Sequence, residues 1–173
     1  MQAAEHGIVT LPERFETFYR REFRSVVGLA YALSGSRWAA EDLAQEAFIA
    51  AHKKWDRIGE YESPAAWVRR VVANMAVSLY RRRASEARAM ARIAVRRQEA
   101  LPALDAEDDE FWAEVRALPK RQAQAIALHY LEDRPVAEVA DILDCSPSTA
   151  KVHLHKGRLR LAERLGTTLG ESS

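Results

Sequence analysis

One segment near the C-terminus carries side chains whose types and spacing suit the recognition of duplex DNA. From Pro147 to Leu165 there are five Lys or Arg residues and one acid, Glu163. Helical spacing places one set of side chains on a common face, namely Ser148, Lys151, Val152 and His155. At the start of a helix in the major groove such side chains reach base edges, and Lys or Arg further along meet phosphates. We therefore predict a DNA-reading helix; the plainer alternative is a basic surface helix of a small bundle.

The residues before this helix predict a helix-turn-helix. Apolar residues between Pro135 and Leu143 recur at the three- and four-residue intervals of a short amphipathic helix. Asp144 and Cys145 are expected to form the turn. Ser146 is then expected to cap the next helix, with Pro147 at its first position, where a missing N–H costs nothing.

The residues that could support enzymatic chemistry do not form a site. His153 and His155 are two positions apart, so on a helix they point about 200° apart and cannot share a metal ion. The sequence has no glycine-rich loop of the kind that holds phosphates. Cys145 is the single cysteine and is expected to be a small, half-buried turn residue. We therefore predict no enzyme activity, no catalytic residue, no metal site and no cofactor.

Composition indicates a globular protein of the cytoplasm. The 173 residues are 48% hydrophobic and 29% charged, which is enough for one modest core or two small ones. No apolar run approaches the roughly 18 residues that a membrane span needs, and the N-terminus lacks the pattern of a secretory signal. One cysteine suits a reducing compartment. We expect a cytoplasmic location and no membrane insertion.

The net charge of +1 hides separate blocks of opposite charge. Nine arginines and one acid lie between Arg69 and Arg97, whereas six acids and no base lie between Asp105 and Glu114. Blocks of this kind create local fields that the summed charge does not reveal. We expect the acidic block to lie beside the basic surfaces and to screen them.

The whole chain is expected to be all-α. Strand signals are almost absent, while helical patterns cover 12–34, 36–55 and 64–83 in the first half. The simplest organisation has two small helical domains at 10–84 and 109–165, joined by a linker at 85–108 and followed by a disordered tail at 166–173. Residues 84–101 fit either a solvated helix or a flexible tether.

The second predicted helix carries an unusual polar face. Spacings of three, four and seven residues bring together Asp42, Gln45, Glu46 and Ile49. An acidic face that ends in an exposed apolar group suits docking on a basic partner. Considered alone, it fits a solvated helix face better than a docking site.

Two sequence motifs, in order, resemble a known family. AEDLAQEAF at 40–48 is followed by a helix ending in RRR, and then by LPKRQAQAIALHYLED and VAEVADILDCSPSTAKVHLHKGRLRL. Together they resemble bacterial sigma factors of the compact, extracytoplasmic-function group over residues 12–165. The resemblance implies a protein that binds core RNA polymerase, directs it to promoters and assists promoter melting. It also implies an anti-sigma factor as a partner.

The resemblance assigns roles to individual residues. The polymerase-binding set, expected to meet the clamp helices of the β′ subunit, is Asp42, Gln45, Glu46 and Ile49. A second polymerase contact is expected with the β flap. The set for the minus-ten promoter element is Tyr61, Trp67, Arg70, Asn74, Arg81 and Arg82. The set for the minus-thirty-five element is Ser146, Ser148, Thr149, Lys151, Val152, His155, Lys156 and Arg158.

The residue types in the minus-ten set suit the melting of a DNA duplex. Bases that leave the duplex are captured by aromatic rings, at about 1–3 kcal/mol per stacked base, and by arginines along the backbone. Tyr61 is the better stacking candidate, because Trp67 has the helical spacing of a core residue. Asn74 is the candidate for a specific base contact. Arg69 is grouped with Arg70, Arg81, Arg82 and Arg83 as a backbone contact. Gly157 departs from the family pattern, which usually has Ala there.

Two other functions remain open from the sequence. One is a stand-alone helix-turn-helix regulator that binds duplex operators. The other is a decoy or adaptor whose main role is sequestration by a partner. The acidic face around Asp42 favours the sigma-factor interpretation, because a stand-alone regulator has no need of it.

Overall fold

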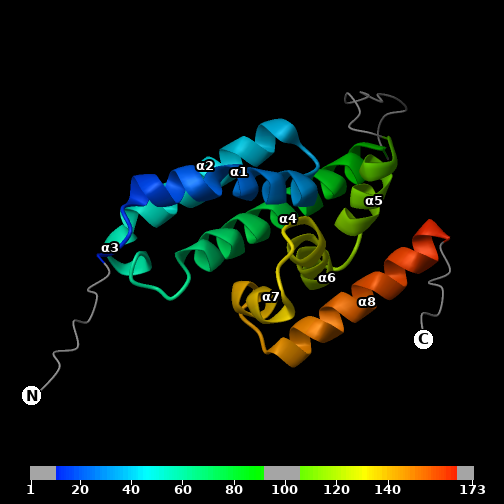
Figure 1. The fold of residues 1–173 in the computed structure, drawn as a ribbon. Coiled ribbons are helices and arrows are strands. Elements are labelled where there is room, and N and C mark those ends of the chain that lie inside the picture. The colour runs from blue at the N-terminus through cyan, green and yellow to red at the C-terminus, as the bar shows by residue number, and fades with distance from the viewer. Residues whose placement is uncertain (1–10, 92–105, 167–173) are drawn as a thin grey trace, which may run out of the picture.

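The computed structural model describes residues 11–91 and 106–166, and every regular element in these ranges is a helix (Figure 1). The predicted all-α class is therefore confirmed. The elements are α1 (Phe15–Ser34), α2 (Arg37–Lys53), α3 (Trp55–Ile58), α4 (Pro64–Ala91), α5 (Ala106–Arg116), α6 (Lys120–Ile126), a π-helical turn (Ala127–Leu131), α7 (Val136–Leu143) and α8 (Pro147–Leu165). Most of the predicted tail and residues 92–105 of the predicted linker lie outside the described residues. Helix α4 continues to Ala91. For the first part of residues 84–101, this favours the solvated helix over the flexible tether.

Helices α1, α2 and α4 form the first domain around an aromatic core. Phe18 and Phe48 are buried there, with ring centres 5.8 Å apart. Local signals set the corner between α1 and α2. Gly35 ends α1 with φ of 72°, a left-handed conformation that glycine adopts at little cost. Ser36 then accepts a hydrogen bond from the backbone N–H of Ala39, as its predicted capping role requires.

Helices α5 to α8 form the second domain, and α8 approaches α6 very closely. Gly157 is buried on the inner side of α8. A Cβ atom at this position would lie only 2.9 Å from Cγ1 of Ile126. The glycine that replaces the usual alanine therefore permits the close packing of these two helices.

The predicted helix-turn-helix is present at α7 and α8. Asp144 ends α7 in a left-handed conformation with φ of 56°. The hydroxyl of Ser146 accepts a hydrogen bond of 3.1 Å from the backbone N–H of Thr149, and Pro147 occupies the first turn of α8. These contacts depend only on neighbouring residues, which explains why the sequence predicts them.

The two domains pack against each other, and both α1 and α4 of the first domain contact the second domain (Figure 1). At the contact Arg69 of α4 is 1% exposed. Its guanidinium donates at 2.7 Å to Glu22 of α1 and at 2.7 Å to Glu132, which follows the π-helical turn. Its third nitrogen donates to Ser25 of α1. Arg69 was predicted to meet the DNA backbone; instead, the structure buries it at the domain contact.

The three charges of this cluster stabilise one another. Burial alone would lower the pKa of Arg69, but the carboxylates of Glu132 and Glu22 outweigh burial and raise it. Burial likewise opposes ionisation of Glu22, yet hydrogen bonds from Arg21 and Arg69 lower its pKa overall. Each charge is therefore tolerated in the interior because its partners are present.

Replacing Arg69 by methionine should cost about 3–5 kcal/mol of unfolding free energy, because the largely buried carboxylate of Glu132 would lose its cation at 2.7 Å and keep only Arg134, at 3.7 Å. Urea unfolding followed by circular dichroism measures this change. Arg24→Met, at an exposed position of α1, is the matched control and should change stability by less than about 0.5 kcal/mol. Equal stabilities for the two variants would show that the buried cluster is not required for folding.

Candidate nucleic-acid and polymerase interfaces

Helix α8 presents its predicted reading face to solvent. Ser148, Lys151, Val152, His155 and Lys156 are all exposed, whereas Ala150, Leu154 and Leu161 on the opposite side are buried. Val152 is a large apolar side chain that remains 48% exposed. The face can therefore enter a major groove without rearrangement of the second domain.

Four members of the predicted minus-thirty-five set also make contacts within the protein, namely Ser146, Ser148, Thr149 and Arg158. The Ser146 hydroxyl lies 2.8 Å from the hydroxyl of Thr149 and caps the helix. Arg158 donates to the hydroxyl of Tyr130, and its guanidinium lies 5.5 Å from the centre of that ring. The Tyr130 contact orients Arg158 in the turn of α8 that follows His155.

Helix α2 carries the predicted acidic face, and all four of its residues are exposed: Asp42, Gln45, Glu46 and Ile49. Trp38 extends this face by one turn, since it precedes Asp42 by four residues and Gln45 by seven. Its side chain is 87% exposed. Sequence reasoning missed Trp38, although its helical spacing to Asp42 was the available signal.

The predicted minus-ten residues fall into two groups. Arg81 and Arg82 are exposed on α4, and Tyr61 is 38% exposed before that helix. Asn74 and Arg70, in contrast, contact the second domain. The side-chain oxygen of Asn74 accepts a hydrogen bond of 3.0 Å from the buried amide of Gln124 in α6. The side-chain groups of Asn74 and Arg70 that would contact a base or the DNA backbone are therefore already bonded to the second domain.

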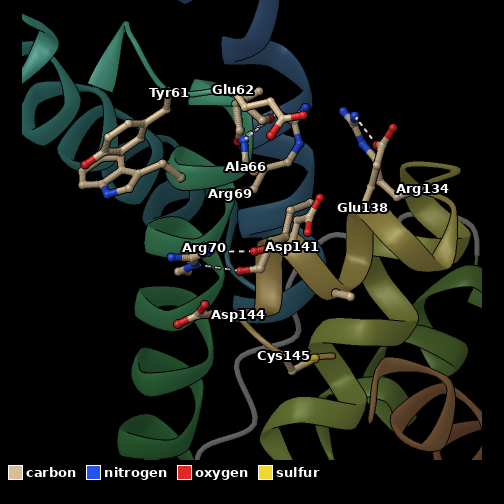
Figure 2. Close-up of a pocket in the computed structure, with 15 residues that line it drawn as sticks. Tyr61, Glu62, Ala66, Arg69, Arg70, Arg134, Glu138, Asp141, Asp144 and Cys145 are labelled. Carbon is tan, nitrogen blue, oxygen red and sulfur yellow. Dashed lines mark hydrogen bonds and ion pairs between the residues drawn. The ribbon is translucent and has the colours of Figure 1, made fainter. Parts of the chain in front are cut away.

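Arg70 closes the end of helix α7. Its guanidinium donates to the backbone carbonyls of Ile142 at 2.9 Å and of Asp141 at 2.7 Å (Figure 2). The last carbonyls of a helix lack intrahelical partners and carry partial negative charge, so a guanidinium there is favourable.

An open cleft of about 640 Å³ lies beside this contact (Figure 2). Its walls include Tyr61 and Trp67 from the first domain and Asp141 and Cys145 from the second. Trp67 is half-buried, as its helical spacing indicated, and Cys145 is half-buried in the turn. The ring available for stacking is thus Tyr61, at the mouth of a cleft that both domains form.

Between 11 and 91 and between 106 and 166, no group of three or more His, Cys, Asp or Glu side chains could hold a metal ion. No helix in these ranges is both long and apolar enough to cross a bilayer.

Comparisons with known proteins match both domains. The family model for Sigma-70 region 2 matches residues 18–86, and the model for Sigma-70, region 4 matches residues 108–161. The chain is 25% identical over 152 residues to the ECF RNA polymerase sigma factor SigW of Bacillus subtilis, covering 79% of this chain and 81% of that protein. It is 27% identical over 168 residues to the RNA polymerase sigma-E factor of Streptomyces avermitilis, covering 92% of this chain and 88% of that protein.

Solved structures share the fold. The sigma factor RpoE of Bartonella quintana, in complex with the anti-sigma factor NepR, superposes with a TM-score of 0.67 at 24% identity. This match covers 91% of the present chain and 98% of that chain. CnrH, in complex with the cytosolic domain of CnrY, gives a TM-score of 0.66 at 20% identity and covers 88% and 87% of the two chains.

Proposed function

The chain belongs to the sigma-70 family, in its extracytoplasmic-function group, and we propose that it directs RNA polymerase to promoters and helps to open them. One observation carries this proposal: the two domains expose faces of opposite chemistry. Helix α2 offers acidic and apolar groups, and α8 offers a capped basic helix. A stand-alone regulator would use only the second face, and a decoy would need no reading helix. The protein would act in the cytoplasm, where RNA polymerase acts, as a non-enzymatic factor.

The α2 face is suited to a basic helical partner on the polymerase, for which we propose the β′ clamp helices. Asp42 and Glu46 supply charge, while Trp38 and Ile49 supply exposed apolar area at the two ends. Tryptophan is among the residues that most often contribute a large share of the binding energy of a protein interface. Trp38 is therefore included in the docking face.

The two promoter elements require the domains to separate. The elements lie roughly 25 base pairs apart, or about 85 Å along the duplex axis. Asn74 of the first domain and Gln124 of the second are joined by a hydrogen bond of 3.0 Å. One protein cannot keep this contact and also read both elements. We therefore propose that polymerase binding separates the domains and frees Asn74 and Arg70, which join the already exposed Tyr61 in contacting the melted strand.

An anti-sigma protein is the second partner that we propose. Two solved relatives of the same fold are in complex with anti-sigma factor NepR and with the cytosolic domain of CnrY. A partner that favours the packed arrangement would keep Asn74 covered and so oppose promoter opening.

The first prediction tests the α2 face. Asp42→Arg combined with Glu46→Arg should weaken binding to core polymerase at least tenfold, since removal of one partner from a buried charge pair costs about 2–5 kcal/mol. It should also abolish run-off transcription from a library of genomic promoters. Glu16→Arg with Glu110→Arg changes the charge equally at exposed positions of α1 and α5, outside the α2 face, and is the control. If core binding survives the first pair of substitutions, the docking assignment is wrong.

The second prediction separates specificity from affinity in α8. Lys151→Ala should change the preferred base at one position of the minus-thirty-five element by about 1–3 kcal/mol. Arg158→Ala should weaken all sequences alike and reduce the salt dependence by about one phosphate contact. Binding to a randomised duplex at two salt concentrations measures both effects. The reverse pattern would mean that α8 enters the groove in the opposite direction.

The third prediction concerns the covered minus-ten residues. Gln124→Met with Glu132→Gln weakens the domain contact through substitutions in the second domain only, so the minus-ten residues themselves are unchanged. The free protein should then bind a single-stranded minus-ten oligonucleotide about tenfold more tightly. This factor corresponds to a shift of about 1.4 kcal/mol in the equilibrium between packed and separated domains. Glu138→Gln, at an exposed position of α7, is the control. Fluorescence anisotropy measures the affinity, and no gain would show that the second domain does not cover the single-strand site.

A further inference from the structure

A second hollow between the domains is strongly cationic. It has a volume of about 720 Å³ and lies where the C-terminal parts of α4 and α8 approach the end of α5 (Figure 1). Five arginines line it: Arg81 and Arg88 from α4, Arg116 from α5, and Arg160 and Arg164 from α8. No acidic side chain is among the lining residues.

The positive charge of this hollow is only partly neutralised. Arg164 lies 3.3 Å from Glu114, and Arg116 lies 3.8 Å from Asp109. Arg81 and Arg88 form no ion pair with any carboxylate that the structure describes. Among the side chains that the structure describes, five guanidinium groups thus face two nearby carboxylates, Glu114 and Asp109, neither of which lines the hollow.

The half-buried position of Arg116, beside four other arginines, carries an electrostatic cost. Arg116 donates a hydrogen bond to the carbonyl oxygen of Ala32 at 3.1 Å. Burial lowers its pKa, although the carboxylate of Asp109 opposes this effect. A partly desolvated cation among four others gains more from an incoming anion than a fully hydrated arginine does.

The arrangement identifies the chemistry of the ligand. Guanidinium groups bind phosphate oxygens through paired hydrogen bonds, and five of them from three helices match several linked phosphates better than one. The volume lies within the usual range of small-molecule sites, about 300–1,000 Å³. Tyr80 also lines the hollow and offers an aromatic surface beside the arginines.

We propose that this hollow binds a linear polyphosphate chain, as free inorganic polyphosphate or as the tail of a nucleotide, and that the bound chain holds the two domains together. Promoter duplex is the less suitable occupant. Residues of both domains form the walls, and reading the two promoter elements separates those domains.

The consequence for regulation rests on the proposed function, whereas the binding itself does not. A ligand that binds only the packed arrangement shifts the equilibrium towards it by a factor of one plus the ratio of free ligand to Kd. At a hundredfold excess over Kd, access to the minus-ten residues would fall about a hundredfold.

Isothermal titration calorimetry of the full chain with sodium tripolyphosphate, at fixed ionic strength and without Mg²⁺, tests the site. We expect one molecule bound per chain and at least tenfold weaker binding by R88Q/R164Q. Arg20→Gln with Arg24→Gln removes the same charge from exposed positions of α1 and should weaken binding less than threefold. Circular dichroism confirms that both variants are folded. Absence of saturable binding, or equal losses in the two variants, would overturn the proposal.

Two further arms identify the source and the effect of the ligand. If ATP binds more tightly than tripolyphosphate, the site favours a nucleotide through Tyr80; equal affinity favours the phosphate chain alone. Tripolyphosphate should also weaken binding of the single-stranded minus-ten oligonucleotide at least tenfold in the α1 control and less than threefold in R88Q/R164Q. Equal effects in both variants would show that the bound ligand does not hold the domains together. The calorimetric titration tests binding to the site itself and does not depend on promoter activity.

Discussion

A buried guanidinium holds the two domains in register. Arg69 is surrounded by Glu22 and Ser25 on one side and by Glu132 on the other. A charge in the interior requires all its partners, because the loss of one leaves another charge unpaired in a medium of low dielectric constant. The same requirement makes this contact reversible. When the domains separate, the guanidinium and the carboxylates regain water, so the net cost of opening is far smaller than the strength of the ion pairs implies.

This contact determines which functional surfaces are available in the free protein. Arg70 and Asn74 lie on the same helix as Arg69, and both reach the second domain. The α2 face and the α8 face point elsewhere and remain exposed. Surfaces suited to the polymerase and to the duplex are thus open, while two of the groups suited to a melted strand, Arg70 and Asn74, are covered. The proposed function therefore places docking on the polymerase before these two groups contact the strand.

The π-helical turn contributes to the same arrangement. It ends at Leu131, directly before Glu132, and its Tyr130 orients Arg158 of α8. Helices with this wider turn are rare and often occur at functional positions. One short irregular segment therefore supports both the domain contact and the position of an arginine beside the reading face.

The sequence alone determined the features that depend on neighbouring residues. Gly35, Ser36 and Ser146 mark helix ends through hydrogen bonds within a few positions, and helical periodicity brings Asp42 together with Glu46 and Ser148 together with Lys151. Only the tertiary structure decided that Arg69 is buried and that Asn74 is hydrogen-bonded to the second domain. In a sequence rich in arginine, Arg69 looks no different from Arg70 or Arg81, and it was predicted to face DNA. Its burial depends on Glu132, 63 positions away, and the partner of Asn74 is 50 positions away. Whether a charge is solvated or paired depends on which distant groups the packing brings to it, and no local pattern carries that information.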